Sequence, residues 1–376
     1  MYSRKRLLHA AALMAFVMIF IGYSILYINR FILILPFVSN IGFSHSVLAG
    51  ILLLLPGLMV AGLERLYQFE KIFLIWILFA VMYAILAVGL GAPSHSLLTQ
   101  GLGFAQALGL WLVFRSLAID TRAVMLMSFV ALIACGFAVL ASPETVTVEN
   151  AELFSYHTTA LVIFLTGYLL ASRLSMRYAV IMITVTLIFL YINGARTEFY
   201  LFALIAPIVA FRKAGMVAFL LGGVIGLVGL ATSLLNRDRI IHAEGASRTL
   251  GLLNLSHDAS YNERVYILKE SISTILYHPI TGSYASYKPG YYSHNALSAW
   301  VDFGIIGFIV YLTCVLMIIR AAIILFRADR IGNLPVFALT LALVASIALS
   351  KAYFHPMMGC VVGILFHSRH KMERVP

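Results

Sequence analysis

The sequence predicts an all-helical (all-α) polytopic membrane protein with about twelve transmembrane helices and one large loop on the outer face. Two features of the composition indicate this fold class: hydrophobic residues make up 62% of the 376 positions, and charged residues only 11%. Average soluble domains have about 45–50% apolar and about 25% charged residues. The third feature is the recurrence of apolar runs of about 20 residues, the length that a helix needs to cross a ~30 Å hydrocarbon core.

The predicted spans follow these apolar runs along the chain, and the first needs a separate argument. It follows Arg4, Lys5 and Arg6 and resembles a signal peptide, but the run is long and lacks a convincing small-residue cleavage site. We therefore predict a retained helix there. The predicted spans lie near 8–28, 46–63, 72–92, 98–117, 123–141, 157–172, 178–193, 197–211, 216–235, 296–319, 335–350 and 354–367.

The distribution of charge orients these helices. With the amino terminus in the cytoplasm, 17 of the 26 Lys and Arg residues fall on the inner side, against 5 of the 15 Asp and Glu residues. This bias agrees with the positive-inside rule. The net charge of +11 is therefore a signal of topology, and no nucleic-acid partner is expected. We predict a single polytopic membrane domain over residues 1–376.

The largest connection, residues 236–295, is predicted to lie on the outer face and to hold part of the active site. Loops of this length in compact proteins tend to be functional. Within it, residues 262–277 are expected to form an amphipathic helix that ends before Pro279. This helix either lies at the membrane interface or packs on the other helices as a cap, and the sequence leaves both open. Its expected apolar stripe is Val265, Leu268, Ile272 and Ile275.

Three cationic residues at the predicted outer boundary are the leading catalytic candidates: Arg196, Arg264 and His294. Arginine forks match phosphate oxygens, and two of them facing one site would hold a pyrophosphate. Histidine exchanges a proton near neutral pH, as attack by a hydroxyl on a lipid-pyrophosphate donor requires. Each residue also has a plainer explanation. Arg196 snorkels or pairs with Glu198, Arg264 is a solvated loop residue, and His294 belongs to an interfacial aromatic belt.

Asp302 is expected about two turns inside an apolar span, where an ionised carboxylate costs ~2.5–3.5 kcal/mol on insertion scales. We therefore expect it to fix one of the arginines or a polar path to the acceptor, with a structural ion pair as the alternative. Asn295, Tyr292 and Lys351 lie at the same predicted boundary. Together with Asp302, they are the expected substrate-binding residues.

Motifs of metal and nucleotide sites are missing from the sequence. It has no Gly-rich phosphate loop, His-Glu-x-x-His, paired cysteines or Asp-x-Asp. Cys135, Cys314 and Cys360 fall inside apolar runs and are expected to be packed core residues. We therefore predict a site that uses no metal and no other cofactor.

Several short motifs follow one another between residues 190 and 320. They are Asn193-Gly194-Ala195-Arg196-Thr197, Arg264, His278-Pro279-Ile280-Thr281-Gly282, Ser293-His294-Asn295-Ala296-Leu297 and Phe303-Gly304-Ile305-Ile306-Gly307. In order and spacing, this stretch resembles the O-antigen polymerase and O-antigen ligase superfamily of bacterial envelope biogenesis. The resemblance implies a glycosyltransferase of the membrane-embedded GT-C type that uses an undecaprenyl-pyrophosphate-linked glycan as donor without a metal.

Carried over by position, the resemblance implies that Arg196 and Arg264 hold the pyrophosphate and that His294 contacts or deprotonates the acceptor hydroxyl. The sequence departs from the family in two ways. Asp302 stands where glutamate is common, and the stretch from Arg264 to His294 is shorter than in many ligases, which slightly favours a polymerase. The implied location is the bacterial inner (cytoplasmic) membrane, with the active site facing the periplasm. The implied partners are an undecaprenyl-pyrophosphate-linked oligosaccharide, membrane lipid and a protein that regulates chain length.

Three functions stay open at this point. The first is a polysaccharide polymerase that adds the glycan to another lipid-linked repeat unit, and the second is a ligase that adds it to lipid A-core. The third, from another class, is a flippase or other transporter. Transporters often show internal repeats and ionisable residues at the bilayer midplane. Here the charges concentrate at the predicted outer boundary, which favours an enzyme.

Overall fold

The computed structural model describes residues 2–24, 52, 54–55, 66–141, 156–212, 259–287 and 293–373. Within these ranges every regular element is a helix, and no strand occurs. In the part of the chain that the structure describes, six helices are long and apolar enough to cross a membrane, and shorter apolar helices accompany them. The chain is therefore an all-helical, multi-pass membrane protein. The predicted spans at 46–63 and 216–235 fall largely or wholly outside the described residues, so the number of twelve stays a prediction.

The helices match the predicted spans, with ends shifted by several residues. The largest difference is at α13, which was expected to end near 319 and continues to Ala328. Arg320 and Arg327 end the apolar run without ending the helix, because arginine is a good helix former. The elements are α1 (Tyr2–Phe16), the π-helical η1 (Val17–Ile21), α4 (Gln68–Gly89), α5 (His95–Ser116), α6 (Arg122–Ala141), α7 (Tyr156–Arg173), α8 (Met176–Ile192), α9 (Arg196–Phe211), α12 (Ala259–Tyr277), α13 (Ser298–Ala328), α14 (Arg330–Leu349) and α15 (Met357–Met372).

Two compact units contain these helices. Unit 1 comprises Met1–Ala15, Val47–Leu117 and Asn262–Pro376, and unit 2 comprises Phe16–Ser46 and Ala118–Tyr261. Helix α12 belongs to unit 1 from Asn262 onward. The single membrane domain predicted from the sequence stays a prediction.

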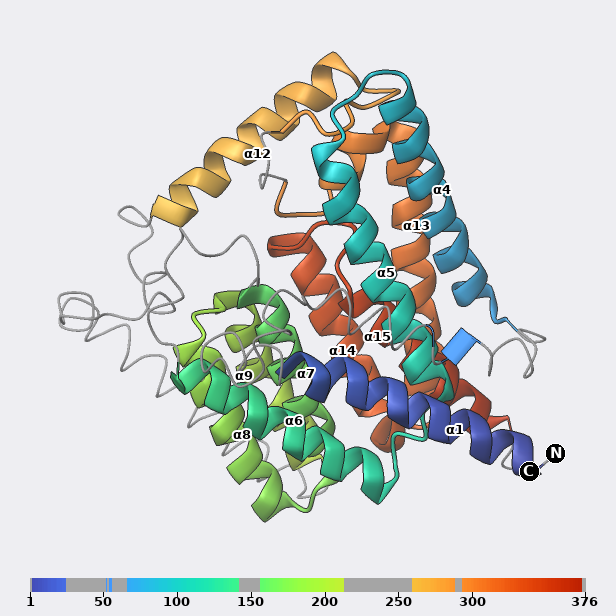
Figure 1. Ribbon diagram of the computed structural model, residues 1–376, viewed down its shortest axis with the longest axis vertical. Coiled ribbons are helices and arrows are strands. Elements are labelled where there is room, and N and C mark those ends of the chain that lie inside the picture. Colours follow the sequence, from blue (N-terminus) through green and yellow to red (C-terminus); the bar gives the residue numbers. More distant parts are fainter. Residues whose placement is uncertain are drawn as a thin grey trace, which may run out of the picture. The chain divides into compact units, whose positions relative to one another are not determined.

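Unit 1 is built from α4, α5, α13, α14 and α15, which pack side by side (Figure 1). The most extensive contact joins α5 and α15, which run parallel. A Cβ atom at Gly359 of α15 would lie 1.7 Å from the carbonyl oxygen of Ala107, and one at Gly363 would lie 2.7 Å from that of Trp111. Small residues spaced four apart let two membrane helices approach closely enough for van der Waals packing to hold them.

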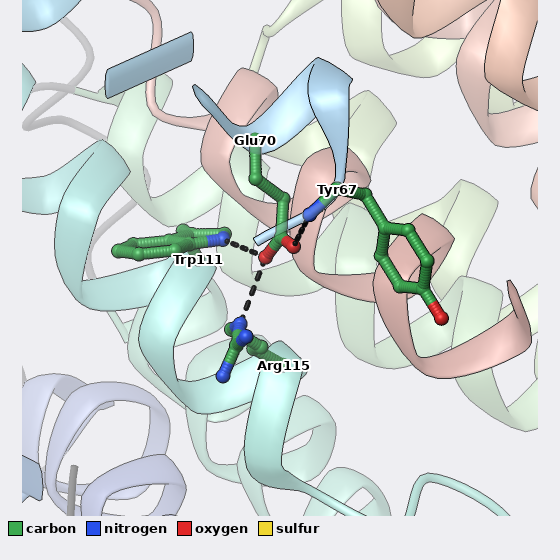
Figure 2. Close-up of polar contacts among 4 residues, drawn as sticks. All are labelled: Tyr67, Glu70, Trp111 and Arg115. Carbon is green, nitrogen blue, oxygen red and sulfur yellow. Dashed lines mark hydrogen bonds and ion pairs between the residues drawn. The ribbon is translucent and has the colours of Figure 1, made fainter. Parts of the chain in front are cut away.

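A buried carboxylate joins three helices of unit 1 at one end (Figure 2). Glu70, fully buried at the start of α4, accepts hydrogen bonds from Trp111 Nε1 (3.0 Å), Arg115 Nε (2.8 Å) and the backbone N–H of Tyr67 (3.0 Å). The Arg115 guanidinium also lies 3.9 Å from the centre of the Phe366 ring on α15. Because a buried charge is costly without a partner, this arrangement fixes α4, α5 and α15 relative to one another.

Unit 2 is built from α6, α7, α8 and α9, with η1 against α6. Tyr23 hydrogen-bonds to Thr159 of α7 across 2.8 Å. Arg173, at the end of α7, forms an ion pair with Asp120, and Arg212, after α9, donates to the backbone carbonyl of Ser172 (2.9 Å). The ends of α7 and α9 that carry these arginines therefore lie together, and the start of α9 lies at the opposite end of the unit.

Candidate functional site

The start of α13 is broken at Gly304, where the backbone has φ 65° and ψ −170°. The break takes the carbonyl of Val301 and the N–H of Ile305 out of the helical hydrogen-bond ladder. The N–H of Ser283 donates to the Val301 carbonyl (2.6 Å), and the Ile305 N–H donates to the carbonyl of Pro279 (3.0 Å). Two motifs of the sequence, 278–282 and 303–307, are therefore joined by backbone hydrogen bonds.

Asp302, at this break, is 6% exposed and forms the centre of a polar network. Its carboxylate accepts hydrogen bonds from Tyr353 Oη (2.8 Å), the backbone N–H of Ala285 (3.1 Å) and Gln100 Nε2 (3.2 Å). Gln100 in turn accepts a hydrogen bond from the Tyr284 hydroxyl (2.9 Å). Within the described ranges the hydrogen-bond donors to Asp302 are neutral and none of them is an arginine, and a polar path to the acceptor stays a prediction.

The Asp302 network connects three parts of unit 1: α5, the loop at 283–287 and the connection between α14 and α15. Aromatic rings pack around it. The Phe303 ring centre lies 4.9 Å from that of Tyr353 and 6.2 Å from that of Tyr284, and Trp76 packs against both Phe303 and Tyr353. Since apolar surroundings strengthen hydrogen bonds, we infer that Asp302 holds these loops in place.

The segment 293–298 forms a turn that is fixed by its own polar groups. Asn295 Oδ1 accepts hydrogen bonds from the Leu297 N–H (2.9 Å) and from Ser293 Oγ (2.9 Å). Ser298 Oγ donates to the Asn295 carbonyl (2.8 Å) and accepts from the Tyr353 N–H (3.3 Å). The structure therefore gives Asn295 a local role in holding the turn that carries His294, and its role in substrate binding stays a prediction.

Three basic residues, Arg264, His294 and Lys351, come together at this end of unit 1, and we call them the cationic cluster. The pKa of His294 is lowered to about 4: burial is the largest cause, the positive charges of Arg264 and Lys351 act in the same direction, and a hydrogen bond to the Ser350 backbone opposes the shift. Lys351 is only 3% exposed. The cluster therefore combines two basic side chains with an imidazole that is neutral at pH 7.

Helix α12 brings Arg264 to the cluster, and the face that it buries in unit 1 is not its predicted apolar stripe. Ile267 is 2% exposed and packs against Tyr287 and Val301, and the Ser271 hydroxyl hydrogen-bonds to Tyr287. Leu268 and Ile272 of the predicted apolar stripe are 36% and 46% exposed. The helix forms as predicted over 262–277, but the loop at 283–287 decides which of its faces is covered.

Of the remaining predicted site residues, one belongs to unit 2 and one lies outside the described residues. Arg196 begins α9 in unit 2, after a turn at Gly194 with φ 72°, and interacts electrostatically with Tyr200. Tyr292 lies outside the described residues. The sequence analysis missed Gln100, although a glutamine near the end of an apolar span is a usable signal, because a polar amide inside the membrane needs a partner.

The described residues contain no group of three or more His, Cys, Asp or Glu that could hold a metal ion. All three cysteines are buried and free. No protein-family model, no curated protein and no solved structure matches this chain. What the fold and the site define is therefore a multi-pass helical membrane protein with a cationic cluster at one end of a helix bundle.

Proposed function

We propose that this protein is a membrane glycosyltransferase of the superfamily it resembles, a polysaccharide polymerase that transfers an undecaprenyl-pyrophosphate-linked glycan to another lipid-linked repeat unit. The observation that carries the proposal is the cationic cluster. In it, Arg264 and Lys351 lie near a neutral histidine, close to the start of α13. Buried basic groups are costly without a partner, and clustered cations suit an anionic ligand.

The cluster supplies the groups that glycosyl transfer needs. The acceptor hydroxyl attacks the anomeric carbon of the donor, a new C–O bond forms, and the bond to the pyrophosphate breaks. Arg264 and Lys351 stabilise the negative charge that develops on the leaving undecaprenyl pyrophosphate, and the resemblance gives Arg196 the same role. Neutral His294 accepts the proton of the attacking hydroxyl. The positive charge comes from side chains, so the proposed mechanism uses no metal.

The charge distribution of unit 1 supports a periplasmic site. Asp302 and the cationic cluster lie where α13 begins and α14 ends, while the opposite helix ends are rich in basic residues. By the positive-inside rule, those opposite ends face the cytoplasm. We therefore propose about twelve spans in a bacterial inner membrane, with the cluster outside. The basic residues at the opposite ends are Lys71, Arg115, Arg320, Arg327, Arg330, Arg369 and Lys371.

The experiment uses purified protein in nanodiscs, an undecaprenyl-pyrophosphate-linked repeat unit and a chelator, with products separated on a gel. A ladder from the lipid-linked unit alone supports the polymerase, and product only with added lipid A-core identifies a ligase. Absence of product with both acceptors contradicts the proposal, and substrate flux in sealed vesicles would then identify a transporter.

Variants locate the activity in the cluster. Arg264→Ala and His294→Ala should each lower product formation by at least about 100-fold, the scale for loss of one donor to a developing charge. Arg196→Ala tests the contribution proposed from unit 2. The matched controls are Lys269→Ala on α12 and His278→Ala after it, both exposed, which should retain activity. Normal product from all three site variants, with normal membrane insertion, contradicts the mechanism.

A further inference from the structure

Helix α12 has an exposed apolar stripe beside its buried face. Leu268, Ile272 and Leu276 are 36%, 46% and 74% exposed and recur every four residues, so they lie along one side of the helix. Lys269 and Ser273 are exposed beyond the stripe and mark its polar edge. The exposed apolar surface continues past the end of the helix to Ile280, which is 66% exposed.

Backbone contacts place the end of this stripe beside a membrane-spanning helix. The carbonyl of Pro279 accepts hydrogen bonds from the Ile305 N–H (3.0 Å) and from Trp300 Nε1 (3.0 Å). The part of α13 after the break, residues 305–328, is about 36 Å long at ~1.5 Å per residue. This segment is long enough to cross a hydrocarbon core ~30 Å thick, and we infer from its broken start that Ile305 lies near the boundary of that core.

The exposed side of α13 starts directly after Ile305. Ile306 and Ile309 are 58% and 55% exposed, and exposed apolar side chains in a membrane span face lipid. Figure 1 shows α12 meeting the ends of α5 and α13 at its own end and running obliquely away from them rather than along them. The exposed stripe therefore continues from the lipid-facing surface of a span along a helix that leads away from the end of the bundle.

We propose that α12 is an interfacial membrane helix whose Leu268, Ile272 and Leu276 side chains insert among the acyl chains of the bilayer. Such helices bury one apolar side below the headgroups and keep charged residues above them. The Pro279 carbonyl accepts two hydrogen bonds from within the protein. This fits the proposed placement, because backbone carbonyls at membrane depth need internal partners. Insertion also holds Arg264, one turn before Leu268, at the headgroup level. The inference does not depend on the proposed transferase activity.

The test is spin labelling of single cysteines in the full-length protein in lipid nanodiscs. Cysteine replaces Leu268, Ile272 or Leu276 in one set and Tyr266, Glu270 or Ser273 in the control set, which lies on other sides of α12. Collision with oxygen, which concentrates in lipid, is compared with collision with a water-soluble nickel chelate. The unmodified chain is the labelling control, since Cys135, Cys314 and Cys360 are buried.

The expected result is that labels at 268, 272 and 276 collide more with oxygen than with the nickel chelate, and that labels at 266, 270 and 273 show the opposite. Equal and high access of the chelate to all six positions would overturn the proposal. Low access of both reagents to 268, 272 and 276 would also overturn it, because the stripe would then be covered by protein.

Discussion

Gly304 and Ile280 lie in backbone contact: a Cβ atom on Gly304 would be 1.9 Å from the Ile280 carbonyl oxygen. This contact seats the turn at 278–282 in the break of α13. The freed N–H of Ile305 then donates to Pro279 of this turn, and the freed carbonyl of Val301 accepts from the N–H of Ser283, the residue after the turn. Asp302 lies between them, so the close approach at Gly304 positions the carboxylate that organises the neighbouring loops.

Gly304→Ala should destabilise the protein and reduce its activity. Alanine at φ 65° is strained by about 1–3 kcal/mol, and the added methyl group meets a backbone atom that has no room to move. We expect a lower midpoint of thermal unfolding in detergent. Gly101→Ala on α5 is the control, since nothing lies within 4 Å of its added Cβ atom. Equal midpoints for both variants would contradict the tight seating of the turn.

Tyr353→Phe should loosen the site while leaving the helices intact. It removes one hydrogen bond to the buried Asp302 carboxylate, which costs about 1.5–3 kcal/mol for a charged acceptor. We expect Asp302→Asn to have a similar effect. If the two side chains act through each other, the double variant should lose less stability than the sum of the single variants. Strict additivity in chemical unfolding would show that the hydrogen bond has no energetic role.

Glu70→Gln should be strongly destabilising because it leaves Arg115 without the charge that it faces. Both side chains are buried, and breaking such a pair from one side costs about 3–5 kcal/mol. The double variant Glu70→Gln with Arg115→Met removes both charges and should recover part of this loss. The partly exposed pair Arg369–Glu373 is the control, and Glu373→Gln should cost less than about 1 kcal/mol, because glutamine can still accept the hydrogen bond from the Tyr67 hydroxyl. Comparable losses for Glu70→Gln and Glu373→Gln would contradict the role of the buried pair.

Protonation of His294 should set the acid limb of activity. A lowered pKa means that the positive form is disfavoured, so the imidazole stays neutral until the pH falls to about 4. The plot of kcat/KM against pH should therefore fall only near pH 4. Bound pyrophosphate adds negative charge, which favours the imidazolium, so the acid limb of kcat should lie at higher pH. Coinciding limbs would show that no anion binds beside His294.

Removing the positive charge of Lys351 should raise the pKa of His294. Lys351→Met takes away a positive charge that lowers the pKa of His294, so this pKa should rise toward its ordinary value. Nuclear magnetic resonance of isotope-labelled histidine measures the pKa without requiring activity. Lys269→Met removes a cation that is absent from the causes of the shift and should leave the pKa unchanged. Identical His294 pKa values in both variants would show that the charge of Lys351 does not act on His294.

The membrane-spanning helices followed from the sequence because their signal is local. A run of apolar residues long enough to cross the bilayer must become a helix, since its backbone groups find partners in no other way. The same reasoning located α12, whose apolar periodicity and following proline define its extent. The prediction of α13 was too short because hydropathy reports where a helix leaves the membrane and not where it ends.

The partners of individual side chains were decided only by the tertiary structure. Gln100 and Asp302 are 202 positions apart, and Glu70 and Arg115 are 45 apart, so their pairing depends on which helices pack together and at what height. The buried face of α12 was equally out of reach, because it is set by contacts of Ile267 and Ser271 with Tyr287 and Val301, which are distant in sequence. Hydropathy and charge bias along the chain determined that this protein lies in a membrane and which residue types meet its boundary. Helix packing decided which of those residues form one site, because side-chain contacts follow distance in space rather than in sequence.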